Sequence, residues 1–236
     1  MFSFDSTIRF SEVDLQRRLS LSAIVNYFQD CSTFQSEAIG LGFDHLAGLH
    51  RVWLMSAWQV IIHRLPLFGE HVRIGTWAHS FDAFYGGRNF VLVDAAGETV
   101  VAANSIWVFA DTETGRPAKL TPADVAGYEL EPPYPMTYAG RKIALPAESE
   151  LLPAFPIVQS QLDYNRHVNN GQYIRMAESY LPDGFSVGEF RADYRKSAYL
   201  GDTIYPHRHL TDTTCTIVLA DEAGKPYTTV QFLVQK

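Results

Sequence analysis

The chain has 236 residues, of which 47% are hydrophobic and 13% aromatic, enough apolar material for one large domain or two small ones. Its formal net charge of −7 argues against a general nucleic-acid binder, which needs a basic excess. The N-terminus lacks the basic region and long apolar run of a secretory signal, and no stretch approaches the ~20 apolar residues that span a bilayer. We therefore expect a cytoplasmic protein.

The sequence predicts neither a metal site nor a cofactor site. The two cysteines, Cys31 and Cys215, fit no metal-ligand spacing and no disulfide scaffold. Gly86-Gly87 predicts a bulge or a tight turn, because the Gly-Lys-Ser/Thr of a phosphate loop does not follow it.

The first half of the chain predicts a helix followed by several strands. The segment Arg9 to Arg18 precedes an amphipathic helix predicted from residue 21 to about residue 41. Segments rich in β-branched and aromatic residues then predict strands over 52–63, 72–78, 88–93 and 99–110. Asp94-Ala-Ala-Gly97 predicts a hairpin turn in which the glycine takes the positive φ.

A proline-rich segment follows these strands. Eight of the 12 prolines lie from Pro117 to Pro156, and proline lacks the N–H group that a sheet requires. We therefore predict an N-terminal domain over 1–120, a linker over 121–155 and a C-terminal domain over 156–236.

The second half repeats the order of the first. Gln161 to His167 parallels Arg9 to Arg18, and each segment precedes a helical pattern. Segments 198–205 and 220–225 parallel segments 65–74 and 93–98. Chance similarity between short β patterns is the alternative explanation. A helix against an antiparallel sheet, present twice, predicts an α+β fold whose two copies form an internal pseudo-dimer.

The start of the second copy carries the most informative motif. Asp163, Asn165 and His167 lie two residues apart, so in an extended segment they point the same way. A helical pattern follows at once, with Asn169 or Asn170 as the predicted N-cap. The sequence thus predicts a reaction site at the N-terminus of a helix.

Each polar group of this motif suits a catalytic role. A histidine exchanges protons near neutral pH, which makes His167 the candidate proton-transfer group. Asp163 can orient it or a water molecule, or act as a nucleophile. The Asn165 amide can hold a carbonyl or a water. The candidate oxyanion donors are the N–H groups at the start of the helix, those of Val168, Asn169 and Asn170.

The two copies differ at these positions. Asp14 matches Asp163, but Gln16 stands in place of Asn165 and Arg18 in place of His167. A lone histidine is usually structural, yet its spacing from two further polar residues favours the functional interpretation. Only the second copy is therefore predicted to be catalytic.

Basic residues gather near the motif despite the acidic whole. Such a patch is usually a solvated face, and the alternative is a docking surface for an acidic or phosphate-bearing partner. The candidate docking residues are Arg166, Arg191, Arg195 and Lys196.

Over nearly its full length the chain resembles the acyl-acyl-carrier-protein thioesterases, a plant and bacterial family built as a tandem double hotdog. The most specific shared motif is Asp163-x-Asn165-x-His167-Val-Asn-Asn-x-x-Tyr173. Further shared segments are Arg9-x-x-Glu12, the run from Trp53 through Arg64-x-Pro66-x-x-Gly69, Thr76-Trp77 and Ser105-Ile-Trp107-Val.

The resemblance implies hydrolysis of the thioester between a fatty acyl chain and the phosphopantetheine of an acidic acyl carrier protein, the step that ends fatty acid synthesis. It also implies that the N-terminal hotdog holds the acyl chain and the C-terminal one supplies catalysis. Plant members carry a Glu-Cys pair where this chain has Ser197-Ala198. A cysteine nucleophile therefore has no candidate at that place.

Three functions stay open at this point. The first is the acyl-carrier-protein thioesterase, and the second is an acyl-CoA thioesterase, because both carriers end in the same pantetheine thiol. The third is a non-catalytic fatty-acyl binding protein, suggested by the missing Glu-Cys pair. The oligomeric state, monomer or homodimer, is open as well.

Overall fold

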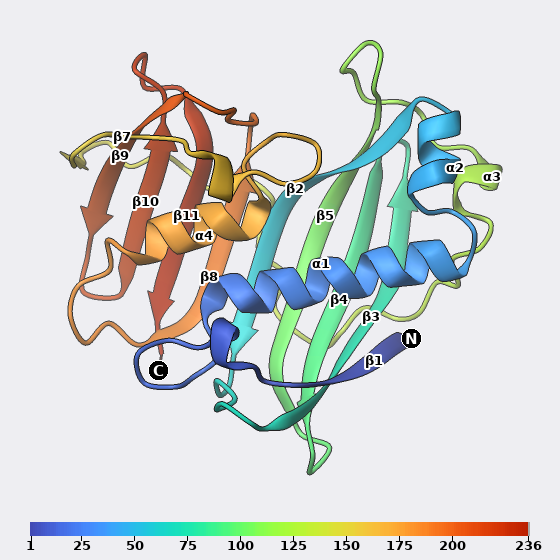
Figure 1. The fold of residues 1–236 in the computed structure, drawn as a ribbon, viewed down its shortest axis with the longest axis horizontal. Helices are drawn as coiled ribbons and strands as arrows, with labels where there is room; N and C mark the ends of the chain where they lie inside the picture. The colour runs from blue at the N-terminus through green and yellow to red at the C-terminus, as the bar shows by residue number, and fades with distance from the viewer. Residues whose placement is uncertain (236) are drawn as a thin grey trace. The chain divides into compact units, whose positions relative to one another are not determined.

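The computed structural model describes residues 1–235, which divide into two compact units (Figure 1). The first comprises residues 1–56 and 62–138, and the second comprises residues 57–61 and the described residues from 139 onward. The main division between residues 138 and 139 falls inside the predicted linker. The inclusion of residues 57–61 in the second unit is a feature that the sequence did not predict.

The first unit is a helix laid against an antiparallel sheet. Its strands pair in the order β1-β3-β4-β5, and α1 lies across one face of them (Figure 1). Its elements are β1 (Phe2–Thr7), η1 (Phe10–Glu12), α1 (Leu21–Ala38), α2 (Phe43–Gly48), β2 (Arg51–Ile62, shared with the second unit), β3 (His71–Asp82), β4 (Tyr85–Asp94), β5 (Thr99–Asp111) and α3 (Pro122–Val125).

Helix α1 forms where the sequence predicts it. The Ser20 side chain caps its N-terminus by accepting a hydrogen bond from the Ala23 N–H, at 3.3 Å. Its buried residues recur at helical spacing, and the Phe28 ring stacks on Phe90 of β4 with centroids 5.0 Å apart. The helix ends at Ala38, short of the predicted residue 41, because Gly40 takes a φ of +74°.

The second unit has the same architecture with fewer residues. Antiparallel strands pair in the order β8-β11-β10-β9-β6, residues 57–61 of β2 pair with β8, and α4 lies across the sheet (Figure 1). Its elements are β6 (Glu150–Leu151), β7 (Phe155–Pro156), η2 (Gln159–Gln161), α4 (Asn170–Glu178), β8 (Val187–Tyr194), β9 (Thr203–Leu210), β10 (Thr214–Ala220) and β11 (Pro226–Val234).

Turns and a bulge fall where glycines predicted them. Gly97 and Gly224 take φ values of +88° and +74° in the two equivalent hairpins. Gly86 and Gly87 lie within β4, opposite a register shift on β3 between Ala78 and Ser80. The glycine pair therefore accompanies a bulge within a strand pair.

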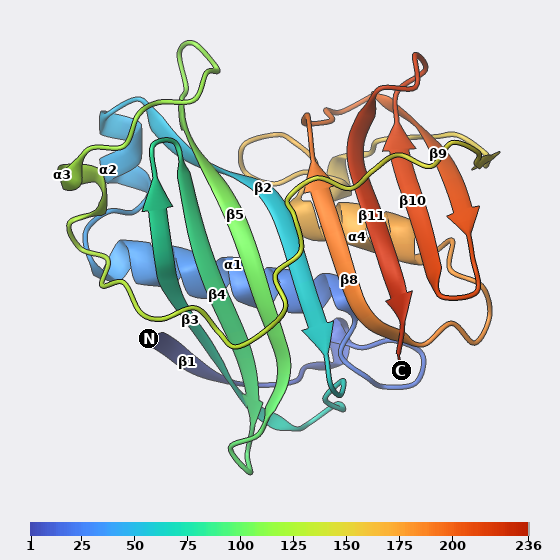
Figure 2. The ribbon, with the colours of Figure 1, turned by 180° about the vertical axis from the view of Figure 1, so that it is seen from behind.

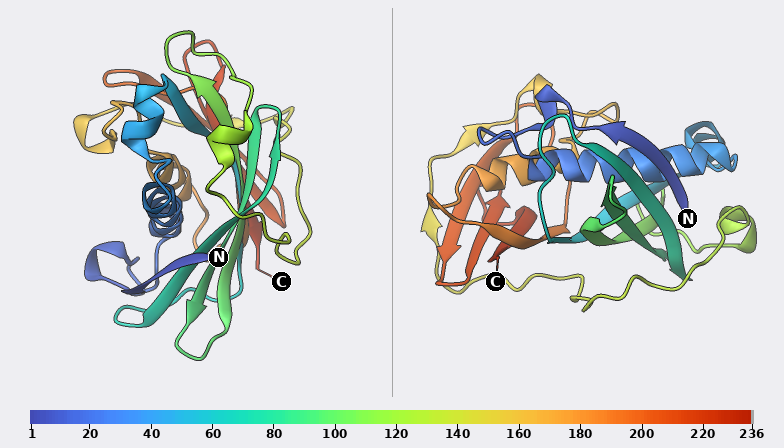
Figure 3. Two further views of the ribbon diagram at one scale, coloured as in Figure 1. Left: turned by 90° about the vertical axis from the view of Figure 1, so that its right-hand side faces the viewer. Right: turned by 90° about the horizontal axis from the view of Figure 1, so that it is seen from below.

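The proline-rich segment contains only the short α3, β6 and β7 and is fastened by side chains of the sheets. In the first unit the Trp77 Nε1–H donates to the Pro132 carbonyl, at 2.9 Å, and the Asn89 Oδ1 accepts from the Tyr134 N–H, at 3.0 Å. Figure 2 shows residues up to 138 crossing the back of this sheet, and Figure 3 shows α1 on the opposite face. The segment thus covers the outer face of the sheet.

Within residues 1–235, no helix is both long and apolar enough to cross a membrane.

Candidate active site

The loop that carries the motif is closed by the side chain of its first residue. The Asp163 Oδ1 accepts hydrogen bonds from the N–H groups of Asn165, at 2.9 Å, and His167, at 3.3 Å. The Asp163 N–H donates to the His167 carbonyl at 2.8 Å, and Arg166 takes a φ of +63° at the tip. The motif is therefore a tight turn rather than a straight extended segment.

The first unit contains the same turn. The Asp14 Oδ1 accepts from the N–H groups of Gln16, at 2.9 Å, and Arg18, at 2.8 Å. The Asp14 N–H donates to the Arg18 carbonyl at 2.8 Å, and Arg17 takes a φ of +61°. The predicted duplication is confirmed at the level of individual hydrogen bonds.

The candidate catalytic side chains face different surroundings within this turn. Asn165 is exposed, whereas His167 is half-buried. The imidazole meets the Tyr199 ring edge to face, with centroids 5.5 Å apart, and the two residues also form a backbone bridge. Sequence reasoning missed Tyr199, although it stands in the repeated segment that ends at Gly201-Asp202.

The N-terminus of α4 narrows the choice of oxyanion donor. The Val168 N–H donates to the Ala198 carbonyl and the Asn169 N–H to the Gln161 carbonyl, each at 3.0 Å. The prediction that these two groups are free for an oxyanion is wrong, because they anchor the helix entry. Asn169 is the N-cap, and the Asn170 N–H has no acceptor within residues 1–235.

A buried tyrosine also holds the segment that leads into α4. The Tyr173 hydroxyl accepts the N–H of Ala198 at 2.8 Å, and burial raises the pKa of Tyr173 well above its ordinary value. Tyr173 thus ties the segment after β8 to the helix that follows the motif.

Tyr173→Phe should lower the free energy of unfolding by about 1–3 kcal/mol, because it leaves the buried Ala198 N–H without its acceptor. Urea unfolding measures this change. The matched control is Tyr180→Phe in the same unit, since the structure gives the Tyr180 hydroxyl no hydrogen bond within the described chain. Equal stability of the two variants would show that the bond to Ala198 contributes nothing.

The two residues at the Glu-Cys position of plant members lie in different environments. Ser197 is exposed, and Ala198 is fully buried with its backbone engaged by the helix entry. Neither cysteine replaces the missing thiol, because both are buried. Burial raises the pKa of Cys31 to about 12 and also raises the pKa of Cys215, which disfavours the reactive thiolate.

Three of the four candidate docking residues have partners inside the second unit. An Arg191 Nη2–H group donates to the Gly140 carbonyl, Arg195 forms an ion pair with Asp193 at 3.0 Å, and Lys196 forms one with Asp221. Among the four, Arg166 alone has no such contact in the part of the chain that is described. These contacts weaken the prediction of docking for three of the residues and leave Arg166 as the clearest candidate.

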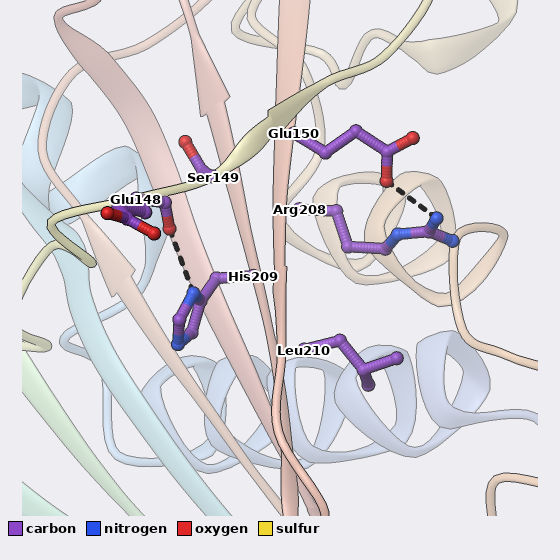
Figure 4. Close-up of a pocket in the computed structure, with 6 residues that line it drawn as sticks. All are labelled: Glu148, Ser149, Glu150, Arg208, His209 and Leu210. Atoms are coloured by element: carbon purple, nitrogen blue, oxygen red, sulfur yellow. Dashed lines mark hydrogen bonds and ion pairs between the residues drawn. The ribbon is translucent and has the colours of Figure 1, made fainter.

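A surface cavity of about 410 Å³ lies apart from the motif residues, none of which lines it (Figure 4). Its walls come from residues 148–150 and from β9. Figure 4 shows the Arg208 guanidinium paired with Glu150, at 2.7 Å, and His209 hydrogen-bonded to the Glu148 carbonyl. These contacts fasten the short β6 segment to the sheet.

Two units in one chain, each a helix laid against antiparallel strands, define the tandem double hotdog class. Two solved structures share this fold. An acyl-ACP thioesterase from Bacteroides thetaiotaomicron has a TM-score of 0.91 at 19% identity, covering 99% of this chain and 97% of that one. The 12:0-ACP thioesterase from Umbellularia californica has a TM-score of 0.86 at 18% identity, covering 99% and 96%.

Sequence comparison gives the family. The family model of the acyl-ACP thioesterase N-terminal domain matches residues 1–128, so the chain belongs to the acyl-ACP thioesterase family. A palmitoyl-acyl carrier protein thioesterase of Arabidopsis thaliana is 28% identical over 203 residues, which are 78% of this chain and 48% of that protein. The oleoyl-acyl carrier protein thioesterase 1 of the same plant is 27% identical over 233 residues, covering 89% and 63%. The chain therefore spans less than two thirds of either relative.

Proposed function

We propose that the protein hydrolyses the thioester between a fatty acyl chain and acyl carrier protein, releasing the free fatty acid and ending fatty acid synthesis. The observation that carries this proposal is the difference between two otherwise equivalent turns. The second unit presents Asn165 and His167 where the first presents Gln16 and Arg18. Family membership supports the substrate class.

The chemistry needs only water and the residues at the turn. His167 takes a proton from a water molecule as the water oxygen bonds to the thioester carbon. The developing oxyanion is stabilised by the Asn170 N–H at the positive end of α4. The carbon–sulfur bond then breaks, and the thiol leaves with the proton from His167. The Asn165 amide holds the carbonyl or the water.

The two units have separate tasks in this proposal. The first unit, most of which lies within the match to the N-terminal domain of the family, binds the acyl chain. The second unit supplies catalysis, since it alone carries the imidazole at the turn. We place the reaction in the cytoplasm.

An acyl-CoA thioesterase is the second candidate function. The observation that favours it is the internal pairing of Arg191, Arg195 and Lys196, which leaves little basic surface at these positions for an acidic carrier protein. Measuring kcat/KM for release of the same fatty acid from acyl carrier protein and from CoA decides between the two. A marked preference for CoA would overturn the first proposal, and no release from either would refute both.

Arg166→Glu should lower the ratio of kcat/KM on acyl carrier protein to kcat/KM on acyl-CoA by about tenfold. The reason is that a reversed charge beside the site repels an extended acidic protein surface. The matched control is Arg17→Glu, at the tip of the equivalent turn in the first unit, which should leave the ratio unchanged. An unaltered ratio in Arg166→Glu would exclude docking at this residue.

A further inference from the structure

The Asp163 carboxylate accepts the same two backbone hydrogen bonds as a carboxylate in a turn that has no imidazole, that of Asp14, which also pairs with Arg18. In both turns Oδ1 accepts from the N–H groups two and four residues later, and the residue between them adopts a left-handed conformation. In the first unit those two N–H groups belong to Gln16 and Arg18, neither of which has an imidazole side chain. The turn therefore forms around an aspartate even where no imidazole is present for proton transfer.

We propose that Asp163 is a positioning residue, whose carboxylate closes the turn and thereby aims Asn165 and His167, and that it is neither the nucleophile nor the base. This inference rests on the proposed hydrolysis. Two backbone N–H groups point at the Oδ1 lone pairs and stabilise the negative charge of the carboxylate. Covalent attack through either oxygen would remove that charge and weaken the bonds that define the turn.

The contacts explain why the position of the carboxylate matters to the chemistry. The N–H groups that Asp163 holds belong to the two residues whose side chains are proposed to act. The closing bond from the Asp163 N–H to the His167 carbonyl fixes the same stretch from the other side. A displacement of reacting groups by about 1 Å can lower the rate about 10²-fold. Loss of these hydrogen bonds should therefore displace the imidazole and slow the reaction.

Asp163→Asn and Asp163→Ala separate positioning from direct chemistry. Asparagine keeps a side-chain oxygen that accepts both N–H groups but has no nucleophilic or basic carboxylate. We expect Asp163→Asn to retain kcat/KM within about tenfold of the wild type and Asp163→Ala to lose about 10²-fold. The acidic limb of the kcat/KM profile against pH should persist in Asp163→Asn, because His167 remains the proton acceptor.

Asp14→Asn and Asp14→Ala are the matched controls, because they change the equivalent turn without touching His167. Asp14→Ala should lower Tm at least as much as Asp163→Ala does, because it also removes the ion pair with Arg18, while kcat/KM stays within about twofold of the wild type. The proposal is overturned if Asp163→Asn keeps the wild-type Tm yet is as inactive as Asp163→Ala, or if it loses the acidic limb.

Hydrogen exchange gives a readout that does not depend on hydrolysis. The amide protons of Asn165 and His167 should exchange slowly in the wild type and in Asp163→Asn, and faster in Asp163→Ala. Unchanged exchange in Asp163→Ala would overturn the positioning role. A wild type that exchanges as expected but releases no fatty acid would instead refute the proposed function.

Discussion

His167→Ala should lower the kcat for fatty acid release by about 10²- to 10⁴-fold, the usual range for loss of a positioned general acid–base group. In the proposed hydrolysis this imidazole both accepts the proton of water and returns it to the leaving thiol, so two transfers are lost at once. The imidazole is half-buried and lies edge to face against the Tyr199 ring. Free fatty acid released from acyl carrier protein is the quantity to measure.

The matched control for this prediction is Arg18→Ala in the first unit. Arg18 occupies the equivalent place in its turn and pairs with Asp14 at 2.9 Å, so its removal perturbs a turn of the same geometry. We expect this variant to keep nearly full hydrolysis. A His167→Ala enzyme that still turns over normally, or an Arg18→Ala enzyme that loses as much, would refute the assignment of chemistry to the second unit.

The repeated architecture was predictable because short local signals specify it. Asp-x-x-Gly turns, the Gly69 and Gly201 positions and the helical spacing after each motif all act within a few residues of the chain. Positive φ values at both glycines, +84° and +85°, match the requirement that the sequence imposes there. Signals that act over only a few residues can be recognised in a single sequence.

The roles of backbone groups at the site were not predictable in the same way. The Val168 N–H finds its acceptor on Ala198, and the Tyr173 hydroxyl accepts from the same residue, 25 residues further along the sequence. The pattern of side chains in a sequence does not predict which backbone carbonyl oxygen accepts a given hydrogen bond. Asp163 shows the converse case, since its residue type suggests chemistry and the structure adds that its carboxylate closes a turn.

The basic residues in and directly after β8 illustrate a third limit. Arg191 and Arg195 alternate along an outer face, which in sequence is indistinguishable from a solvated or docking surface. In the structure they bind carbonyl oxygens of the proline-rich segment, those of Gly140 and Ile143. Asp193, nearly fully buried between them, accepts the Ile143 N–H at 3.3 Å. The charges hold the linker against the sheet.

Arg195→Ala should therefore lower the free energy of unfolding by about 3 kcal/mol. Asp193 loses its only cationic partner in the described residues and remains as a buried carboxylate, the situation in which breaking an ion pair is most costly. The lower end of the usual range applies because the Arg195 side chain is itself 34% exposed. Urea unfolding measures the loss, and the slope of the transition checks that the same surface is exposed in both proteins.

Two further variants separate linker fastening from carrier docking. Lys196→Ala removes the more exposed pair with Asp221 and the contact of the ammonium with the Tyr227 ring, and it should cost less than about 2 kcal/mol. The double variant Asp193→Leu/Arg195→Met removes both charges and should be less destabilising than Arg195→Ala, because no charge is left buried alone. Arg195→Ala could instead leave unfolding unchanged and lose activity on acyl carrier protein but not on acyl-CoA. That result would make Arg195 a docking residue, because a residue that only fastens the linker should affect stability and should not distinguish between the two carriers.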